Sequence, residues 1–334
     1  MQESYIFTMI NEHTAENAAA EFLTFDDAAE QVKQEVGRLL SASPKPIRNY
    51  TQHLALSWGK FLRSRALLAC AENREGLLHP NAVKLASAIE VLHLATLVHD
   101  DVIDNADLRR GFVTLQKKFG KRTAVICGDY LFCLALEQAA SIPNKRDYLD
   151  FNIPDYMTRI CLGELRQNQN NNNLDLSVAG YLRIISGKTA ALFEASFYAG
   201  AILCEEEKDA VEKYMRLGHL IGMIFQLTDD CIDFEAPRQL AKKPVQSDYE
   251  QGVITLPLIY AFQTRSAFKE KARGEKISRE EINAAVEETG GLSYTKTVSK
   301  KYYDKAFKII RKLGASENKK ERLQSILDKA YRGL

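Results

Sequence analysis

The chain has 334 residues, of which 46% are hydrophobic and 27% are charged. This composition is that of an ordinary globular protein and excludes collagen-like, fibrous and wholly disordered classes. The 45 Lys and Arg residues nearly balance the 44 Asp and Glu residues, so no basic excess points to nucleic acid as a partner.

The first residues, MQESYIFTMINEHTAE, lack the basic start and apolar core of a secretory signal. The longest apolar runs, at residues 123–127 and 196–204, fall short of the roughly 18 apolar residues of a membrane span. The six cysteines include no CxxC pair, which favours reduced thiols. We therefore expect a cytoplasmic protein with at most transient membrane contact.

Helical periodicity dominates the chain. Residues 16–40 predict an amphipathic helix that ends at the following Ser-Pro-Lys-Pro segment. Four further stretches are apolar nearly all round, as in helices buried in a core: residues 82–98, 123–139, 182–204 and 213–227. Residues 265–334 predict charged surface helices, and residues 143–144 and 168–173 predict loops. Strand signals are weak.

No change in composition marks a linker between domains. Short loops between long apolar helices favour one large all-α domain over two. The sequence therefore predicts a single all-α domain over residues 1–334.

An acidic pattern occurs twice, as DDVID at residues 100–104 and DDCID at residues 229–233. Each copy ends an apolar helical segment, and positions i and i+4 share one helix face. Three carboxylates in such a place repel one another and are costly to bury without a cation. Magnesium fits, because it takes oxygen ligands and bridges carboxylates to phosphates, whereas zinc requires nitrogen or sulfur ligands. A single copy is as often a solvated helix end, but two copies on apolar helices favour a metal site.

Basic side chains accompany the two acidic patterns. Six of them adjoin apolar sequence: Lys60, Arg63, His93, Arg109, Arg110 and Lys188. Each alone is more often a surface residue, and a lone histidine on an apolar helix is most simply a core residue. Together they indicate a pocket for two anionic ligands, one with metal and one without, because arginine and lysine both bind phosphate oxygens.

The longer context resembles one family, the trans-isoprenyl diphosphate synthases. LVHDDVIDNADLRRG and FQLTDDCIDF resemble its two aspartate-rich motifs, WGKFLRS its GGKRxRP element, and KPVQSDYEQGVITLP its KPxxxDxxxGKxTLP segment. The matches run in family order over residues 59–257. CGDYLF and the small residues before the first acidic pattern most resemble the medium- and long-chain branch, including the catalytic subunit of heptaprenyl-type synthases. The resemblance implies a helical bundle around a central cavity.

The resemblance also implies the reaction, a head-to-tail condensation of an allylic diphosphate with isopentenyl diphosphate that uses Mg²⁺ as cofactor. The implied direct magnesium ligands are Asp100, Asp104 and Asp229. The aspartates implied to act directly or through water are Asp101, Asp230 and Asp233. The implied contacts to the allylic diphosphate are Arg109, Lys188 and Lys243. The implied metal-free contacts to isopentenyl diphosphate are Lys60, Arg63, His93 and Arg110. The dipoles implied to face the carbocation are those of Thr189 and Gln226.

Product length is predicted from the helix that carries the first acidic pattern. A growing apolar chain would run from the diphosphate toward the N-terminus of this helix, past the small residues Ala95 and Thr96. Small residues there open a tunnel, whose depth Ile89 and Leu92 would help to set. They predict a product longer than farnesyl, C30–C40 by resemblance. A product of farnesyl or geranylgeranyl length is the alternative, and close helix packing is the alternative explanation for Ala95.

Three positions depart from the family pattern. Phe61 replaces the first arginine of GGKRxRP, Ser64 replaces its proline, and Val253 replaces the lysine of GKxTLP. The last change removes one expected contact to the allylic diphosphate. Relatives that a small partner subunit completes tolerate this loss, so we expect either a homodimer or a heteromer with a small regulatory subunit.

Two other interpretations compete with a synthase. A terpene cyclase also carries DDxxD, but it needs neither a second full copy nor a set of residues for isopentenyl diphosphate. An inactive regulatory subunit of a synthase pair would not need all six aspartates, which are present here. Both alternatives explain less of the sequence.

Overall fold

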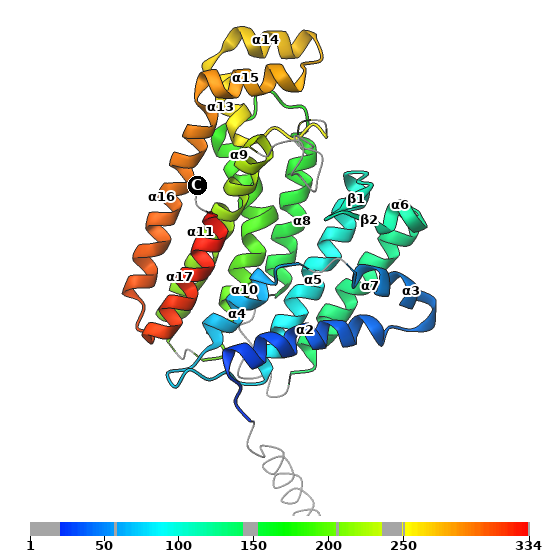
Figure 1. The fold of residues 1–334 in the computed structure, drawn as a ribbon, viewed down its shortest axis with the longest axis vertical. Helices are drawn as coiled ribbons and strands as arrows, with labels where there is room; N and C mark the ends of the chain where they lie inside the picture. Colours follow the sequence, from blue (N-terminus) through cyan, green and yellow to red (C-terminus); the bar gives the residue numbers. More distant parts are fainter. Residues whose placement is uncertain are drawn as a thin grey trace, which may run out of the picture.

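The computed structural model describes residues 21–56, 59–142, 153–204, 207–235, 249 and 251–332. Helices dominate these residues, so the all-α prediction is confirmed (Figure 1). The prediction of a single domain over residues 1–334 stays a prediction.

The helices follow one another in a long bundle (Figure 1). In chain order they are α2 (Phe25–Ser41), α3 (Lys45–Leu54), α4 (Leu62–Ala71), α5 (Asn81–Ile103), α6 (Leu115–Phe119), α7 (Lys121–Ala140), α8 (Ile153–Gln169), α9 (Val178–Ile185), the π-helical turn η2 (Ser186–Ala190), α10 (Ala191–Ala201), α11 (Lys208–Glu235), α13 (Leu256–Thr264), α14 (Ser266–Gly274), α15 (Arg279–Thr289), α16 (Gly291–Lys312) and α17 (Glu317–Tyr331). Several begin after a hydroxyl residue that accepts a hydrogen bond from the first turn, as Ser177 does before α9 and Ser278 before α15.

The two helices that carry the acidic patterns lie in the core. Helix α5 packs against α2, α4, α7 and α10, and α11 packs against α10, α16 and α17. Apolar side chains surround both, for example Val91 and Leu92 on α5 and Leu217 and Ile224 on α11, all buried. Because α5 and the C-terminal half of α11 offer no continuous polar face, both are stable only inside the bundle. Both acidic patterns therefore start from rigid, buried supports.

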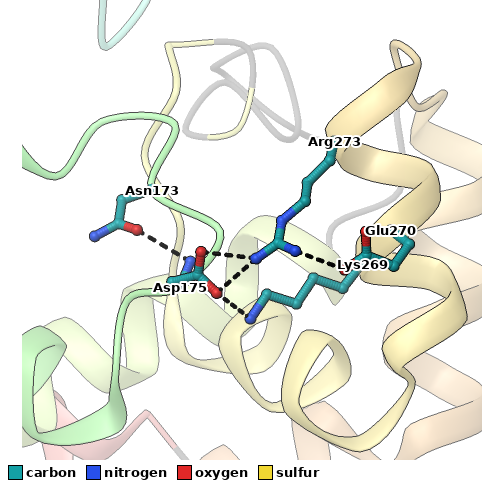
Figure 2. Close-up of polar contacts among 5 residues, drawn as sticks. All are labelled: Asn173, Asp175, Lys269, Glu270 and Arg273. Carbon is teal, nitrogen blue, oxygen red and sulfur yellow. Dashed lines mark hydrogen bonds and ion pairs between the residues drawn. The ribbon is translucent and has the colours of Figure 1, made fainter.

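A second hydrophobic cluster, formed by α9, α13, α15 and their neighbours, fills the end of the molecule beyond the acidic patterns (Figure 1). The loop between α8 and α9 is fastened to this end. Asp175 pairs with Lys269 Nζ at 2.5 Å and with Arg273 Nη2 at 2.9 Å, and both cations belong to α14 (Figure 2). Exposed ion pairs add little stability, so their effect is to place the loop. The predicted loop at residues 168–173 begins at Asn170, because α8 continues through Gln169.

A short antiparallel hairpin, β1 (Leu108–Arg109) and β2 (Phe112–Val113), follows the first acidic pattern. Its turn residues, Arg110 and Gly111, have φ of 53° and 84°. Two-residue hairpin turns favour positive φ at both central positions, and glycine suits the second. The sequence did not predict this hairpin, because two residues per strand give no readable alternation. An arginine held at positive φ is strained, which is typical of functional sites.

Helices α5 and α7 are long and apolar enough to span a membrane by length and composition alone. The prediction of no membrane-length segment was based on uninterrupted apolar runs, and isolated polar residues interrupt both helices. Buried core helices pass the same test, so the finding is weak support for a membrane location. In α5, 61% of the apolar window is buried, whereas in α7 only 33% is. Helix α7 exposes Val125, Ile126 and Leu136.

Candidate active site

The two acidic patterns meet across one large cavity. A space of about 2000 Å³ lies at the C-terminal ends of α5 and α11. Asp100 and Asp104 line it from α5, and Asp229 and Asp233 line it from α11. The structure therefore brings together the two copies that lie 129 positions apart in the sequence.

These carboxylates lie where the backbone already presents negative charge. The C-terminal end of a helix carries a partial negative charge from its unpaired carbonyl groups. Burial raises the pKa of Asp100 to about 6, although nearby Lys188 opposes the shift. Ionised carboxylates are thus held here at a cost, and cations relieve it.

Lys188 supplies one such cation from the π-helical turn η2, whose irregular backbone is typical of functional sites. Its Nζ lies 2.7 Å from Oε2 of Glu164 on α8. Burial lowers the pKa of Lys188, but Asp100 and Glu164 more than compensate, and the net shift is upward. A Cβ added to Gly163 would lie 2.3 Å from the backbone N of Lys188, so only glycine lets α8 approach this turn. The lysine is held in place and charged.

Asp101 lies behind the cavity wall, where its Oδ1 is 2.6 Å from Arg109 Nε. It is buried, and among the described residues it does not line the cavity, whereas Arg109 does. The hairpin turns the chain back and brings Arg109 over the end of α5. This geometry favours Asp101 as a residue that positions Arg109, rather than as a direct metal ligand.

Asp230 is also buried behind the wall and ends a chain of hydrogen bonds. Thr189 Oγ1 donates to Gln226 Oε1 at 2.7 Å, and Gln226 Nε2 donates to Asp230 Oδ1 at 2.9 Å. Tyr181 donates its hydroxyl to the other carboxylate oxygen. Because all these bonds are directional, they fix the amide and hydroxyl dipoles that line the cavity at Thr189 and Gln226.

Asp229 is paired with a residue near the end of the chain. Arg332, which follows α17, places Nη1 at 2.5 Å from Asp229 Oδ1. Its guanidinium also lies 4.8 Å from the centre of the Phe225 ring. Arg332 adopts φ of 50° and lines the cavity, so the C-terminal helix contributes a cation to the second acidic pattern.

A second group of cations lines the same cavity. Lys60, Arg63, His93 and Arg110 all line the cavity. Arg63 Nη1 donates to His93 Nε2 at 3.0 Å, and the guanidinium lies 4.5 Å from the centre of the Phe193 ring. Burial, then Arg63 and Arg110, lower the pKa of His93 well below its usual value. The histidine is therefore neutral and accepts from Arg63.

The donor set fits magnesium bound together with a phosphate ligand. Among the described residues, no three His, Cys, Asp or Glu side chains come together as a closed metal cage. Each acidic pattern instead presents two carboxylates to an open cavity, which leaves most coordination positions to water and ligand oxygens. Magnesium is commonly bound in this way, through one or two carboxylates and substrate phosphates.

The two predicted chain-length residues, Ala95 and Thr96, differ in whether they line the cavity. Thr96 lines the main cavity, but Ala95 is fully buried and, within the described structure, lines neither this cavity nor the next. A further pocket of about 30 Å³ lies deeper in the bundle. Its apolar and aromatic lining comes from α5, α7, α8 and α10: Leu85, Ala88, Ile89, Leu92, Ala135, Leu136, Ala139, Tyr156, Met157 and Ala195. Along α5, at about 1.5 Å per residue, Leu92 lies about 12 Å and Leu85 about 22 Å from Asp100.

Lys243, one of the predicted contacts to the allylic diphosphate, lies outside the described residues. The charged residues Glu90, Glu164 and Arg332 also line the cavity and were not predicted. Glu90 could have been found, because it is the only acidic residue in the largely apolar stretch 82–98. The other two had no readable signal, since their positions depend on how α8 and α17 pack.

Comparison with known proteins agrees with this geometry. The polyprenyl synthetase family profile matches residues 44–289. The chain is 35% identical over 301 residues to heptaprenyl diphosphate synthase component 2 of Geobacillus stearothermophilus, covering 89% of this chain and 92% of that protein. It is 31% identical over 319 residues to octaprenyl diphosphate synthase of Haemophilus influenzae, covering 92% and 93%.

A solved structure of a related synthase has the same fold. The crystal structure of heptaprenyl diphosphate synthase from Staphylococcus aureus superimposes with a TM-score of 0.84 at 32% identity, covering 93% of this chain and 98% of that one. These matches confirm the resemblance drawn from the acidic and basic motifs. The chain belongs to the polyprenyl synthetase family.

Proposed function

We propose that this protein is a magnesium-dependent trans-polyprenyl diphosphate synthase whose product is longer than C15. One observation carries the proposal: two acidic helix ends and a group of cations, Lys60, Arg63, His93 and Arg110, line the same cavity. The first set suits a metal-bound allylic diphosphate, and the second suits isopentenyl diphosphate. Relatives that make heptaprenyl and octaprenyl diphosphates support the product class.

The reaction joins two diphosphates through a carbocation. The allylic C–O bond breaks, and its electron pair leaves with the diphosphate. The double bond of isopentenyl diphosphate then forms the new C–C bond to the cation, and loss of one proton restores a double bond. When bound, magnesium would neutralise the charge that develops on the leaving diphosphate. Asp100, Asp104 and Asp229 would hold it, with Asp233 acting directly or through water.

Side chains of the protein would bind the two diphosphates and face the carbocation. Lys188 and Arg109 would contact the leaving diphosphate. Lys60, Arg63, His93 and Arg110 would bind the second substrate. Fixed cations stabilise developing negative charge without having to reorganise during the reaction. The ordered dipoles of Thr189 and Gln226 face the cation without forming a bond to it. The released diphosphate is the proposed base.

The test is condensation of farnesyl diphosphate with isopentenyl diphosphate in the presence of magnesium. Asp100→Ala and Asp229→Ala should each lower turnover by several powers of ten while circular dichroism stays unchanged. Asp175→Ala, which removes an exposed aspartate outside the cavity, is the matched control and should retain activity. Product formed without isopentenyl diphosphate would favour a terpene cyclase, and near-normal turnover by either cavity variant would exclude the assigned roles.

The assembly is a second part of the proposal. The exposed apolar side chains of α7, Val125, Ile126 and Leu136, are suited to a homodimer interface. The name "component 2" of the related heptaprenyl synthase supports a heteromer with a small subunit as the alternative. Activity of the purified chain alone, with its mass by analytical ultracentrifugation, separates the two. Ile126→Asp should dissociate a homodimer.

We also propose a cytoplasmic location with transient membrane contact, because the product is a long lipid tail. Cell fractionation checks it: the protein should appear mainly in the soluble fraction.

A further inference from the structure

Glu90 is an acidic cavity residue to which the proposed reaction assigns no role. It lies on α5, three residues before His93, and lines the main cavity beside the cation group. Burial raises its pKa, while Ser64, Arg63 and Arg110 oppose the shift. A carboxylate close to two guanidiniums weakens their attraction for a diphosphate. Its presence at an anion site therefore calls for another role.

The contact that defines this role is with the first turn of α4. Ser64 N donates to Glu90 Oε1 at 2.9 Å. The residue that precedes α4, Phe61, has φ of 51° and gives no side-chain cap. The first N–H groups of a helix need partners, and a carboxylate is a favourable one because the helix N-terminus is positive. Glu90 thus caps α4 from a different helix.

This contact depends on Ser64, one of the positions at which the chain departs from the GGKRxRP pattern. GGKRxRP has proline at position 64, and proline has no N–H to donate. Serine supplies a donor, and Glu90 accepts from it. The serine hydroxyl also donates to the carbonyl of Phe61, at 3.0 Å.

The first turn of α4 also carries Arg63. Its guanidinium is fixed between His93 and the Phe193 ring, and burial lowers its pKa to about 10. Among the described residues, the buried Nε of Arg63 has no hydrogen-bond partner. Buried donors of this kind are nearly always bonded, so the site lacks an acceptor that a diphosphate oxygen could supply. Arg110 closes the group from the other side, with its guanidinium against Gly59.

We propose that Glu90 is a positioning residue for the metal-free diphosphate: by bonding Ser64 N–H it holds α4 so that Arg63 faces the bound substrate. The inference rests on the proposed function, because the ligand is isopentenyl diphosphate. Removing the acceptor should weaken binding of this substrate alone. Removing only the negative charge should not weaken it, because the capping bond remains and a charge that repels the diphosphate is gone.

Two variants separate these effects. Glu90→Ala should raise KM for isopentenyl diphosphate at least tenfold, with kcat and KM for farnesyl diphosphate within twofold of wild type. Glu90→Gln keeps an oxygen acceptor and should leave KM for isopentenyl diphosphate equal to or below the wild-type value. Glu194→Ala is the matched control, because Glu194 is a partly buried carboxylate paired with Arg159 outside the cavity. It should lower thermal stability without changing either KM.

Calorimetric binding of isopentenyl diphosphate without magnesium gives an independent readout. If the wild-type protein does not bind it, the proposed function is at fault. If wild type binds and Glu90→Ala binds equally well, the role of Glu90 is refuted. Equal losses for both substrates in Glu90→Ala, or a Glu90→Gln variant as weak as Glu90→Ala, also refute it. If Glu90→Ala does not fold, Glu90→Gln decides alone: a KM for isopentenyl diphosphate raised tenfold overturns the inference, and an unchanged or lower one supports it.

Discussion

Replacing Thr96 with phenylalanine should shorten the product, because this residue lines the path that a growing chain would follow. Thr96 lies one turn before Asp100, or about 6 Å along the axis of α5. The deeper apolar pocket begins about 12 Å from Asp100, at Leu92. A phenyl ring at position 96 therefore closes the path before the chain reaches that pocket. We expect products of C15–C20 in place of longer ones.

The neighbouring residue provides the control. Ala95 is fully buried and does not line either described cavity, so Ala95→Phe adds a ring to a packed core. Overpacking of this kind costs about 1–3 kcal/mol and should appear as a lower melting temperature. Thr96→Phe places its ring in open space and should leave stability nearly unchanged.

The assay incubates each variant with magnesium, farnesyl diphosphate and labelled isopentenyl diphosphate, and sizes the products by reversed-phase chromatography. Wild-type product lengths from Thr96→Phe would refute the assignment of the path. So would shortened products from Ala95→Phe at unchanged stability, because the chain would then run along the other side of α5.

Three further predictions concern the acidic residues. Arg332→Ala should lower the magnesium concentration needed for half-maximal activity at least twofold, because Asp229 loses a competing cation. It should also tighten Mn²⁺ binding measured by electron paramagnetic resonance. Unchanged midpoints in both assays would contradict this prediction. Asp100→Asn should stabilise the metal-free protein relative to wild type, increasingly from pH 4 to pH 7 and by at most about 3 kcal/mol, as measured by calorimetry. The reason is that the pKa of Asp100 is raised to about 6, so its ionisation destabilises the wild-type fold as pH rises. A stability difference that does not change with pH would contradict this prediction. Tyr181→Phe should lower the free energy of unfolding by about 1–3 kcal/mol, because the buried Asp230 loses a donor, and an unchanged denaturation midpoint would count against this.

Much of the fold could be predicted because helices such as α5 are apolar nearly all round, and such segments are stable only in a core. The convergence of the acidic patterns could be predicted because both patterns end core helices and both need cations. The hairpin around Arg110 could not, since its stability comes from contacts with the end of α5 rather than from strand periodicity. The hairpin matters for the site because it brings Arg109 into an ion pair with Asp101.

Residue spacing alone also could not predict the role of each aspartate within the two acidic patterns. Residues i and i+4 share a face, which correctly grouped Asp100 with Asp104 and Asp229 with Asp233 on the cavity wall. Asp101 and Asp230 do not line this cavity wall and are bonded by other side chains, Arg109 for Asp101 and Gln226 and Tyr181 for Asp230. Tyr181, which bonds one of them, lies 49 positions away in the sequence, and no local pattern announces such a pairing.

The two acidic patterns differ in how they are neutralised without metal, and this difference bears on how substrate binds. Lys188 interacts with Asp100 from a turn whose backbone packs closely against Gly163, and its ammonium pairs with Glu164. Arg332 reaches Asp229 from beyond the last turn of α17, near the end of the chain. Because Arg332 occupies one oxygen of Asp229, we expect a metal ion at the second pattern to displace this arginine. At the first pattern we expect a metal ion to bind beside the lysine, which pairs with Glu164. Metal binding at α11 should therefore release Arg332 and move the end of α17, while the α5 side stays as it is.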